Sequence, residues 1–338
     1  TYMAVAAEHP LATRAAKARS ACRPWSRDLG PLRGAFVFFG GFGEPLSHPR
    51  IVDMVARVTA LGCKAELITN ATLLTPEMSR DLISAGLDTL WVSIDGATPE
   101  SYSDIRLGAL LPKVLENLGH FSRAVAADAR DEFFIGYVPR TKLGISFVAM
   151  KRNIRDLPVV IDIGQRYGAE RFLVTNVLPY TEELRREVLY QQGLGGNGYR
   201  PLSVPQMDLG ETTYDPIYQS MRRVYGSWVS FSPEHGHDRC PFIEAGAGAV
   251  RWDGDLSPCL PLLHSHVTYP THGQHETRFS RRWAIGNVTE TGLAKLWRRP
   301  DHLAFRERVQ AFDFPPCVGC GGCELSDRNE EDCIGNTF

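Results

Sequence analysis

The sequence has no excess of either charge, no long apolar run and no repeated unit of the solenoid kind. Lys and Arg number 37 against 39 Asp and Glu, so the formal net charge is −2. Without a strong field of one sign, we expect neither nucleic acid nor an anionic membrane among its partners. No window contains the roughly 18 consecutive apolar residues that a membrane-spanning helix needs. With 43% hydrophobic and 22% charged residues, the composition is that of a globular protein.

Cysteine is scarce in the first two thirds of the chain, where only Cys22 and Cys63 occur. The other six of the eight cysteines crowd the last third: Cys240, Cys259, Cys317, Cys320, Cys323 and Cys333. A secreted disulfide scaffold spreads its cysteines more evenly over a shorter chain. The first residues also lack the charged-then-apolar order of a signal peptide. We therefore expect a cytoplasmic protein with reduced or metal-bound thiols.

Short apolar runs alternate with helical periods between residues 35 and 176, the pattern of consecutive β/α units around a parallel sheet. Strands are expected at 35–39, 64–69, 88–94, 144–150 and 171–175, with a further strand at 2–6. Helices are expected at 50–61, from Thr75 to Gly86, at 111–127, 154–167 and 182–191. A closed eight-unit barrel needs about 250 residues. This α/β region therefore predicts a partial (β/α)6 TIM-like barrel.

The length of 338 residues predicts two domains. We place the partial barrel at 1–192 and a small cysteine-rich domain at 239–338. Between them, residues 193–238 are rich in Gly, Pro, Tyr and Ser, which predicts a bridging region with one or two short helices.

A glycine-rich turn follows the first expected barrel strand and has the sequence FGGFGEP from Phe39 to Pro45. Its glycines leave backbone N–H and C=O groups open to a ligand, and active sites of barrels lie at the carboxyl ends of strands. Polar residues follow the next two strands: Asn70, then Ser93 and Asp95. Such groups suit ribose hydroxyls, although turn-forming and helix-capping roles are the plainer interpretation of each alone. Three strand ends with such residues favour one shared ligand.

The tail contains Cys317-x-x-Cys320-x-x-Cys323 and, nine residues later, Cys333. Four thiolates so close together, with glycines among them, can converge on one metal centre. Zinc ribbons pair two separate C-x-x-C knuckles, so the pattern favours an iron–sulfur cluster over zinc.

Taken together, these motifs resemble the radical S-adenosylmethionine (radical SAM) enzymes that carry a C-terminal SPASM domain, and the resemblance covers nearly the whole chain. It implies that the turn contacts the amino group of S-adenosylmethionine through residues matched by Gly40, Gly41, Gly43, Glu44 and Pro45. It implies that Asn70, Ser93 and Asp95 approach the sulfonium and ribose. The SPASM pattern is matched by Cys240, Gly254 and Cys259, and implies that Cys240, Cys259, Cys317, Cys320, Cys323 and Cys333 bind one or two auxiliary [4Fe-4S] clusters.

The resemblance implies a maturase that cleaves S-adenosylmethionine to a 5′-deoxyadenosyl radical and thereby modifies a peptide, a protein or a metallocofactor. The stretches GGFGEPLSHP and FLVTNVLPYTEEL resemble the group thought to mature tungsten-cofactor oxidoreductases. The cofactors implied are S-adenosylmethionine and [4Fe-4S] clusters. The partner implied, besides the substrate, is an electron donor such as ferredoxin or flavodoxin. The residues assign no catalytic side chain.

One departure concerns the reactive cluster, which the family binds through C-x-x-x-C-x-x-C after its first strand. Here Cys22 matches the last cysteine, but Ala15 and Arg19 occupy the two earlier positions. Neither side chain is a ligand for iron. Either residues 3–21 depart from the natural sequence, which their Ala- and Arg-rich composition favours, or the chain is a catalytically dead member that acts as an iron–sulfur electron-transfer or binding scaffold.

Other residues receive structural interpretations. Cys63 is expected to be a packed small hydrophobe, and His264, His266, His272 and His275 to be loop residues. Tyr180 could line a substrate cavity, but packing is the interpretation we favour. Trp283, Trp297 and Phe305 are expected in the core of the second domain.

Overall fold

The computed structural model describes residues 2–7, 35–101, 111–132, 136–189, 196–199, 202–205, 210–226, 241–244, 246–269 and 277–311. Of the predicted metal ligands, only Cys259 lies within these ranges. Cys22, Cys240, Cys317, Cys320, Cys323 and Cys333 lie outside the described residues, as do Ala15, Arg19, His272 and His275.

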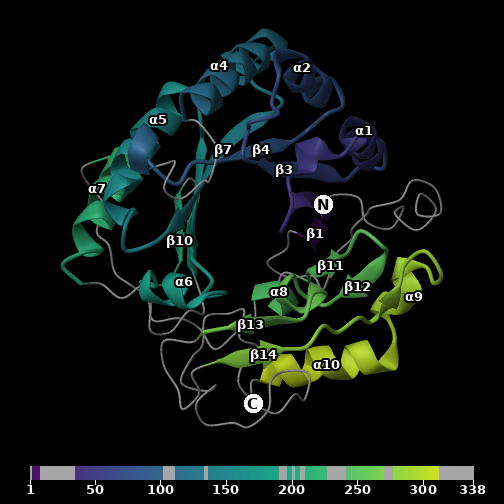
Figure 1. The fold of residues 1–338 in the computed structure, drawn as a ribbon. Coiled ribbons are helices and arrows are strands. Elements are labelled where there is room, and N and C mark those ends of the chain that lie inside the picture. The colour runs from purple at the N-terminus through teal and green to yellow at the C-terminus, as the bar shows by residue number, and fades with distance from the viewer. Residues whose placement is uncertain are drawn as a thin grey trace.

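Six parallel strands form the centre of the sheet in the described part of the chain. They are β2 (Ala35–Gly40), β3 (Lys64–Thr69), β4 (Thr89–Ser93), β7 (Lys142–Ala149), β8 (Arg171–Asn176) and β10 (Leu202–Pro205), neighbours in that order. The helices on their outer side are α1 (Ile51–Ala60), α2 (Pro76–Ser84), α4 (Leu111–Asp128), α5 (Leu157–Arg166) and α7 (Tyr214–Tyr225). Figure 1 shows the sheet curving inside an arc of these helices. The predicted partial barrel is confirmed.

Local sequence signals fix the ends of these helices. The Thr75 side chain accepts a hydrogen bond from the backbone N–H of Met78, and Pro76 occupies the first turn of α2. Gly62 and Gly86, which end the predicted helices, have φ of 73° and 85°. Only glycine adopts this left-handed backbone without a steric cost, so both helices stop where the sequence predicts.

The sheet extends beyond the barrel on both sides. The expected front strand is β1 (Tyr2–Ala7), which runs antiparallel to β2 and also pairs with β11 (Gly248–Val250). On the far side, β10 pairs with β9 (Gly196–Tyr199), so strands occur within the segment expected to be a bridge. The sheet therefore connects the cysteine-rich part to the barrel through main-chain hydrogen bonds, while the domain limits stay a prediction.

The remaining elements are short, except for the 12-residue helix α10. They are η3 (Pro45–Ser47), β5 (Arg130–Glu132), β6 (Gly136–Val138), η4 (Ile154–Asp156), α6 (Glu182–Arg186), α8 (Pro241–Glu244), β12 (Asp255–Ser257), η5 (Pro261–Leu263), β13 (His266–Thr268), β14 (Arg278–Ser280), β15 (Gly286–Asn287), α9 (Leu293–Trp297) and α10 (Pro300–Ala311). No helix among the described residues combines the length and the apolar character needed to cross a membrane.

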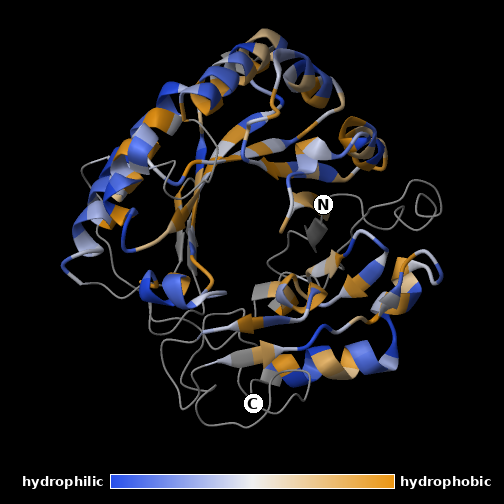
Figure 2. Ribbon diagram, viewed as in Figure 1, coloured by the Kyte–Doolittle hydropathy of each residue, from blue (hydrophilic) through white to orange (hydrophobic). Residues whose placement is uncertain are grey.

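Side chains alternate between the two faces of the barrel sheet. On β4, Leu90 and Val92 are fully buried in the core beneath the helices, whose sheet-facing sides are apolar in Figure 2. Trp91, between them, faces the interior of the barrel and donates a hydrogen bond from Nε1 to Glu66, 2.9 Å away. Glu66 also pairs with Arg171, with 3.5 Å between the charged atoms. The barrel interior therefore holds a polar network of Trp91, Glu66 and Arg171.

The second part of the chain has an aromatic core. Trp297 and Phe305 are buried, as predicted, whereas Trp283 is half-buried with its ring 4.8 Å from that of Phe305. His302 is completely buried beside Trp297 and shares a hydrogen bond with the Trp297 carbonyl (3.1 Å from Nδ1). Burial lowers the pKa of His302 to about 4.

We predict that His302 makes the protein less stable as the pH falls. In the unfolded chain the ring takes up a proton near pH 6.5, whereas the folded protein keeps it neutral down to about pH 4. Its contribution is therefore complete above pH 6.5 and is lost between these values, about 2 kcal/mol of it by pH 5. Denaturant unfolding at pH 7.5 and 5 should show a smaller loss in His302→Phe than in the wild type. Equal losses in the two proteins would contradict this, with His120→Phe as the control.

Candidate functional site

The turn after β2 requires glycine at two successive positions. Gly41 has a φ of 105°, which side chains rarely adopt. A Cβ atom at Gly40 would lie 2.4 Å from Cγ2 of Ile68 and 2.5 Å from the Phe38 ring. Residues 41–43 are exposed, so the turn presents its backbone at the carboxyl edge of the sheet, the edge where the parallel strands end.

The Glu44 carboxylate connects this turn to the end of β3. Its Oε1 accepts hydrogen bonds from the Leu46 backbone N–H (3.0 Å) and the Thr69 hydroxyl (2.7 Å). Its Oε2 accepts one from the Asn70 backbone N–H (2.9 Å). Three donors therefore hold the carboxylate, and the side chain fixes the turn relative to the neighbouring strand.

The end of β3 has a strained backbone. Ala71, directly after Asn70, has a φ of 59°, which is unusual for any residue but glycine. The Asn70 side chain accepts hydrogen bonds from the N–H and the hydroxyl of Thr72, and Asn117 on α4 donates to the Ala71 carbonyl (2.8 Å). Strain held by surrounding contacts is typical of functional sites. Neither Ala71 nor Asn117 was predicted from the sequence as part of the site.

Ser93 and Asp95 lie at the end of β4, the next strand in the sheet, and are 7% and 2% exposed. Asp95 Oδ1 accepts a hydrogen bond from the Val148 backbone N–H at 2.7 Å, and its carbonyl accepts one from Asn153. Asp95 therefore links β4 to β7. Ser93 pairs in register with Ser146 of β7, so two buried hydroxyl residues lie side by side on the inner face.

The predicted residues thus gather at three neighbouring strand ends, because β2, β3 and β4 are adjacent in the sheet. Gly40, Gly41, Gly43, Glu44, Pro45, Asn70, Ser93 and Asp95 all belong to this carboxyl edge. Their binding to a nucleotide stays a prediction. Open glycine backbone beside hydroxyl and carboxamide side chains suits a polar, nucleoside-like ligand.

Sequence reasoning missed an aromatic cluster at the same edge, made of Phe42, Tyr180, His264 and His266. Phe42, in the glycine turn, is 51% exposed, and its ring lies 6.3 Å from Tyr180 and 5.8 Å from His264. Tyr180 and His266 meet edge to face at 5.3 Å. The two histidines were expected to be loop residues, and Tyr180 to serve packing. The signal that could have found them was the bulky Phe42 inserted among glycines.

In the cysteine-rich part, one of the predicted metal-binding cysteines lies among the described residues. Gly254 has a φ of 95° in the turn between β11 and β12, and a Cβ there would lie 2.7 Å from Asn287. Cys259 follows β12 and is 6% exposed. Cys63 is packed in the barrel core, as expected. No cluster of three or more metal-binding side chains occurs among the described residues, and the other predicted ligands lie outside them.

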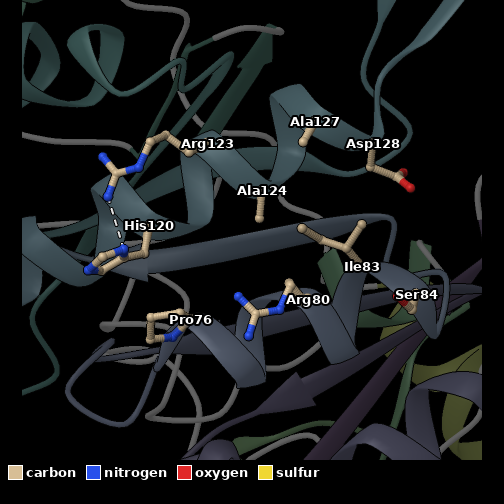
Figure 3. A pocket seen from close by; sticks show the side chains of 9 residues that line it. All are labelled: Pro76, Arg80, Ile83, Ser84, His120, Arg123, Ala124, Ala127 and Asp128. Carbon is tan, nitrogen blue, oxygen red and sulfur yellow. Dashed lines mark hydrogen bonds between the residues drawn. The ribbon is translucent and has the colours of Figure 1, made fainter.

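A groove of about 410 Å³ between α2 and α4 lies on the helix side of the sheet, away from the strand ends (Figure 3). Arg80, His120 and Arg123 line it. Arg80 pairs with Glu77, and Arg123 hydrogen-bonds His120 at 2.9 Å. Because these basic groups already have partners at an exposed surface, the groove is a weaker candidate than the carboxyl edge.

Models of two known families match the two parts of the chain. The radical SAM superfamily model matches residues 27–127, which include the glycine turn and the strand ends after β3 and β4. The SPASM model, an iron-sulfur cluster-binding domain, matches residues 240–324. The second match begins at Cys240 and includes Cys259, Cys317, Cys320 and Cys323.

Individual proteins of known name are also similar to this chain. The chain is 27% identical over 307 residues to the tungsten-containing aldehyde ferredoxin oxidoreductase cofactor-modifying protein of Pyrococcus furiosus, covering 89% of this chain and 78% of that protein. It is 28% identical to mycofactocin maturase MftC of Mycobacterium tuberculosis, covering 94% and 70%. The crystal structure of Streptococcus suis SuiB bound to precursor peptide SuiA superposes with a TM-score of 0.52 at 14% identity, covering 97% of this chain and 71% of that one.

We predict that replacing Glu44 destabilises the carboxyl edge. Glu44→Ala removes the acceptor of three hydrogen bonds, one of them from a buried hydroxyl, and should lower the free energy of unfolding by about 2 kcal/mol. Glu44→Gln should lower it less, because its amide keeps one acceptor but presents N–H groups to another donor. Denaturant unfolding measures both. Glu77→Ala, on the exposed first turn of α2, is the matched control, and an equal effect there would refute the structural role of Glu44.

Proposed function

Because the radical SAM superfamily model matches residues 27–127 and the SPASM model matches residues 240–324, we propose that the chain is a maturase that uses S-adenosylmethionine to modify a peptide, a protein or a metallocofactor by radical chemistry. The observation that carries the proposal is the glycine turn, which Glu44 connects to the end of β3 and which lies beside the ends of β3 and β4. This arrangement offers a polar ligand site at the carboxyl edge of a partial barrel, where barrel enzymes bind their ligands.

The described residues fit S-adenosylmethionine. The backbone of Gly41 and Gly43 is exposed, and no Cβ fills the space in front of it. We propose that the turn binds the amino acid end of the cosubstrate and that Asn70, Ser93 and Asp95 lie toward its sulfonium and ribose. Glu44 then acts mainly by positioning the turn, since its carboxylate already accepts three hydrogen bonds.

The substrate proposed first is the cofactor of a tungsten oxidoreductase. The P. furiosus relative is named for modifying such a cofactor, and the match covers most of both chains. MftC is named as a maturase, and SuiB was crystallised with a precursor peptide. A peptide substrate is therefore the other form of the same proposal. An electron donor such as ferredoxin or flavodoxin would complete the system.

The cysteines fit an auxiliary cluster but not the reactive one. Thiolates at Cys317, Cys320, Cys323 and Cys333 form a donor set suited to iron and sulfide, and Cys240 and Cys259 offer two further thiols. In radical SAM enzymes the reactive cluster supplies one electron to the sulfonium. In this chain only Cys22 is available where three thiolates are needed, since Ala15 and Arg19 bind no iron. We assign no step to a reactive cluster here.

This deficit favours a second candidate function. A chain with the barrel and the tail cysteines intact could bind S-adenosylmethionine and hold an auxiliary cluster without cleaving the cosubstrate. It would then serve as an electron-transfer or binding scaffold.

Restoring the missing ligands separates the two functions. We predict that the unsubstituted chain forms no 5′-deoxyadenosine after anaerobic reconstitution with iron, sulfide and dithionite. The Ala15→Cys/Arg19→Cys variant should gain about four irons per chain and release 5′-deoxyadenosine, quantified by chromatography. The matched control, Ala16→Cys/Ser20→Cys, adds two thiols one position away and should gain neither. If the restored variant binds iron but stays inactive, the scaffold function is supported.

The tail cysteines provide a second test. We predict that Cys320→Ser lowers the iron and sulfide content of the reconstituted chain by about four atoms each, because a thiolate of a [4Fe-4S] site is lost. Cys63→Ser, at a core cysteine, should leave both contents unchanged. Bound zinc without sulfide in the wild-type protein would refute the iron–sulfur assignment.

A further inference from the structure

The aromatic cluster joins three segments that are distant in sequence. Phe42 comes from the turn after β2, Tyr180 follows β8, and His264 and His266 flank the start of β13. A backbone hydrogen bond of 2.8 Å from the N–H of Tyr269 to the carbonyl of Pro179 ties the last two segments together. The second part of the chain therefore lies against the carboxyl edge, directly beside the glycine turn.

One hydrogen bond of His266 indicates which nitrogen of its ring can accept a further hydrogen bond. Nδ1 lies 2.9 Å from the backbone carbonyl oxygen of His264. A carbonyl only accepts, so the proton of the neutral ring resides on Nδ1 and Nε2 carries the lone pair. Nε2 is buried, and no hydrogen-bond donor within the described residues reaches it. A buried acceptor left in this way is costly unless a bound molecule satisfies it.

A second polar atom lies on the same face of the strand. Thr268 is two residues after His266 on β13, so both side chains point to one side. Thr268 is 1% exposed, and its hydroxyl also has no hydrogen-bond partner in the part of the chain that the structure describes. One side of β13 therefore carries an imidazole acceptor and a hydroxyl, next to the edge-on ring of Tyr180.

We propose that Phe42, Tyr180, His266 and Thr268 form a specificity-determining subsite for a planar aromatic or heteroaromatic group of the substrate that bears an N–H or O–H donor. The inference deepens the proposed function and rests on it. Aromatic rings supply flat contact surfaces, and His266 Nε2 accepts the hydrogen bond. Burial, followed by the charges of Arg251 and Arg282, lowers the pKa of the adjacent His264.

Two sources have this chemistry: a tyrosyl side chain of a peptide and the ring of an organic cofactor. The probes are N-acetyltyrosinamide, N-acetylphenylalaninamide and 2-amino-4-oxopteridine, each titrated by NMR into the wild-type chain with S-adenosylmethionine present. The phenol and pteridine carry the donor, and the phenyl ring does not. We expect at least one donor probe to bind about 5- to 10-fold more tightly than the phenyl probe, the effect of one hydrogen bond. Preference for the phenol points to a peptide, and preference for the pteridine points to a cofactor.

The variant His266→Phe keeps a ring beside Tyr180 and removes the acceptor. It should lose the preference for donor probes while binding the phenyl probe as before, a change that a purely structural role would not produce. His120→Phe on α4 is the matched control and should keep the preference. Equal binding of all three probes to the wild type would overturn the inference even if the variant failed to fold.

Failure of the proposed function would look different. If the wild-type chain did not bind S-adenosylmethionine in equilibrium dialysis but still preferred the donor probes, the result would count against the proposed maturase function and not against the subsite.

Discussion

The Glu44 carboxylate accepts hydrogen bonds from both the turn after β2 and the end of β3, and the candidate site depends on this link. The glycines that open the turn to a ligand also make it flexible, because glycine loses the most conformational freedom on folding. One half-buried carboxylate that joins the turn to the neighbouring strand offsets this freedom. Asp95 makes a similar connection between β4 and β7 through the Val148 N–H. The Glu44 and Asp95 carboxylates thus hold the neighbouring strand ends in place, while the glycines leave the backbone of the turn accessible to a ligand.

Much of the barrel was predictable because its signals are local. Alternation of apolar residues located β3 at Lys64–Thr69, and the Thr75 cap with Pro76 located the start of α2. The predicted site residues at the ends of β2, β3 and β4 also came together, because parallel neighbours share one edge. These patterns could not predict which groups each side chain contacts. Glu44 accepts hydrogen bonds from two backbone N–H groups and the Thr69 hydroxyl, and Asp95 Oδ1 accepts one from the Val148 N–H, so both carboxylates also hold strand ends together.

The rest depends on contacts between distant segments. The strand pairing of β1 with β11, the strained Ala71 beneath Asn117, and the meeting of Tyr180 with His266 have no local signature. They show how the SPASM part completes the barrel: β1 joins the two parts into one sheet, and β13 lies beside the carboxyl edge. A substrate at this edge would therefore contact both parts, including His266 of β13, which its spacing in the sequence did not single out.

The most direct test of this account is amide hydrogen exchange of the chain with and without S-adenosylmethionine, followed by mass spectrometry. The account predicts slower exchange on binding in peptides covering residues 40–47, 69–72 and 93–97, the three neighbouring strand ends, and no change in peptides from the groove between α2 and α4. Unchanged exchange at all three strand ends, or protection confined to other segments, would contradict it.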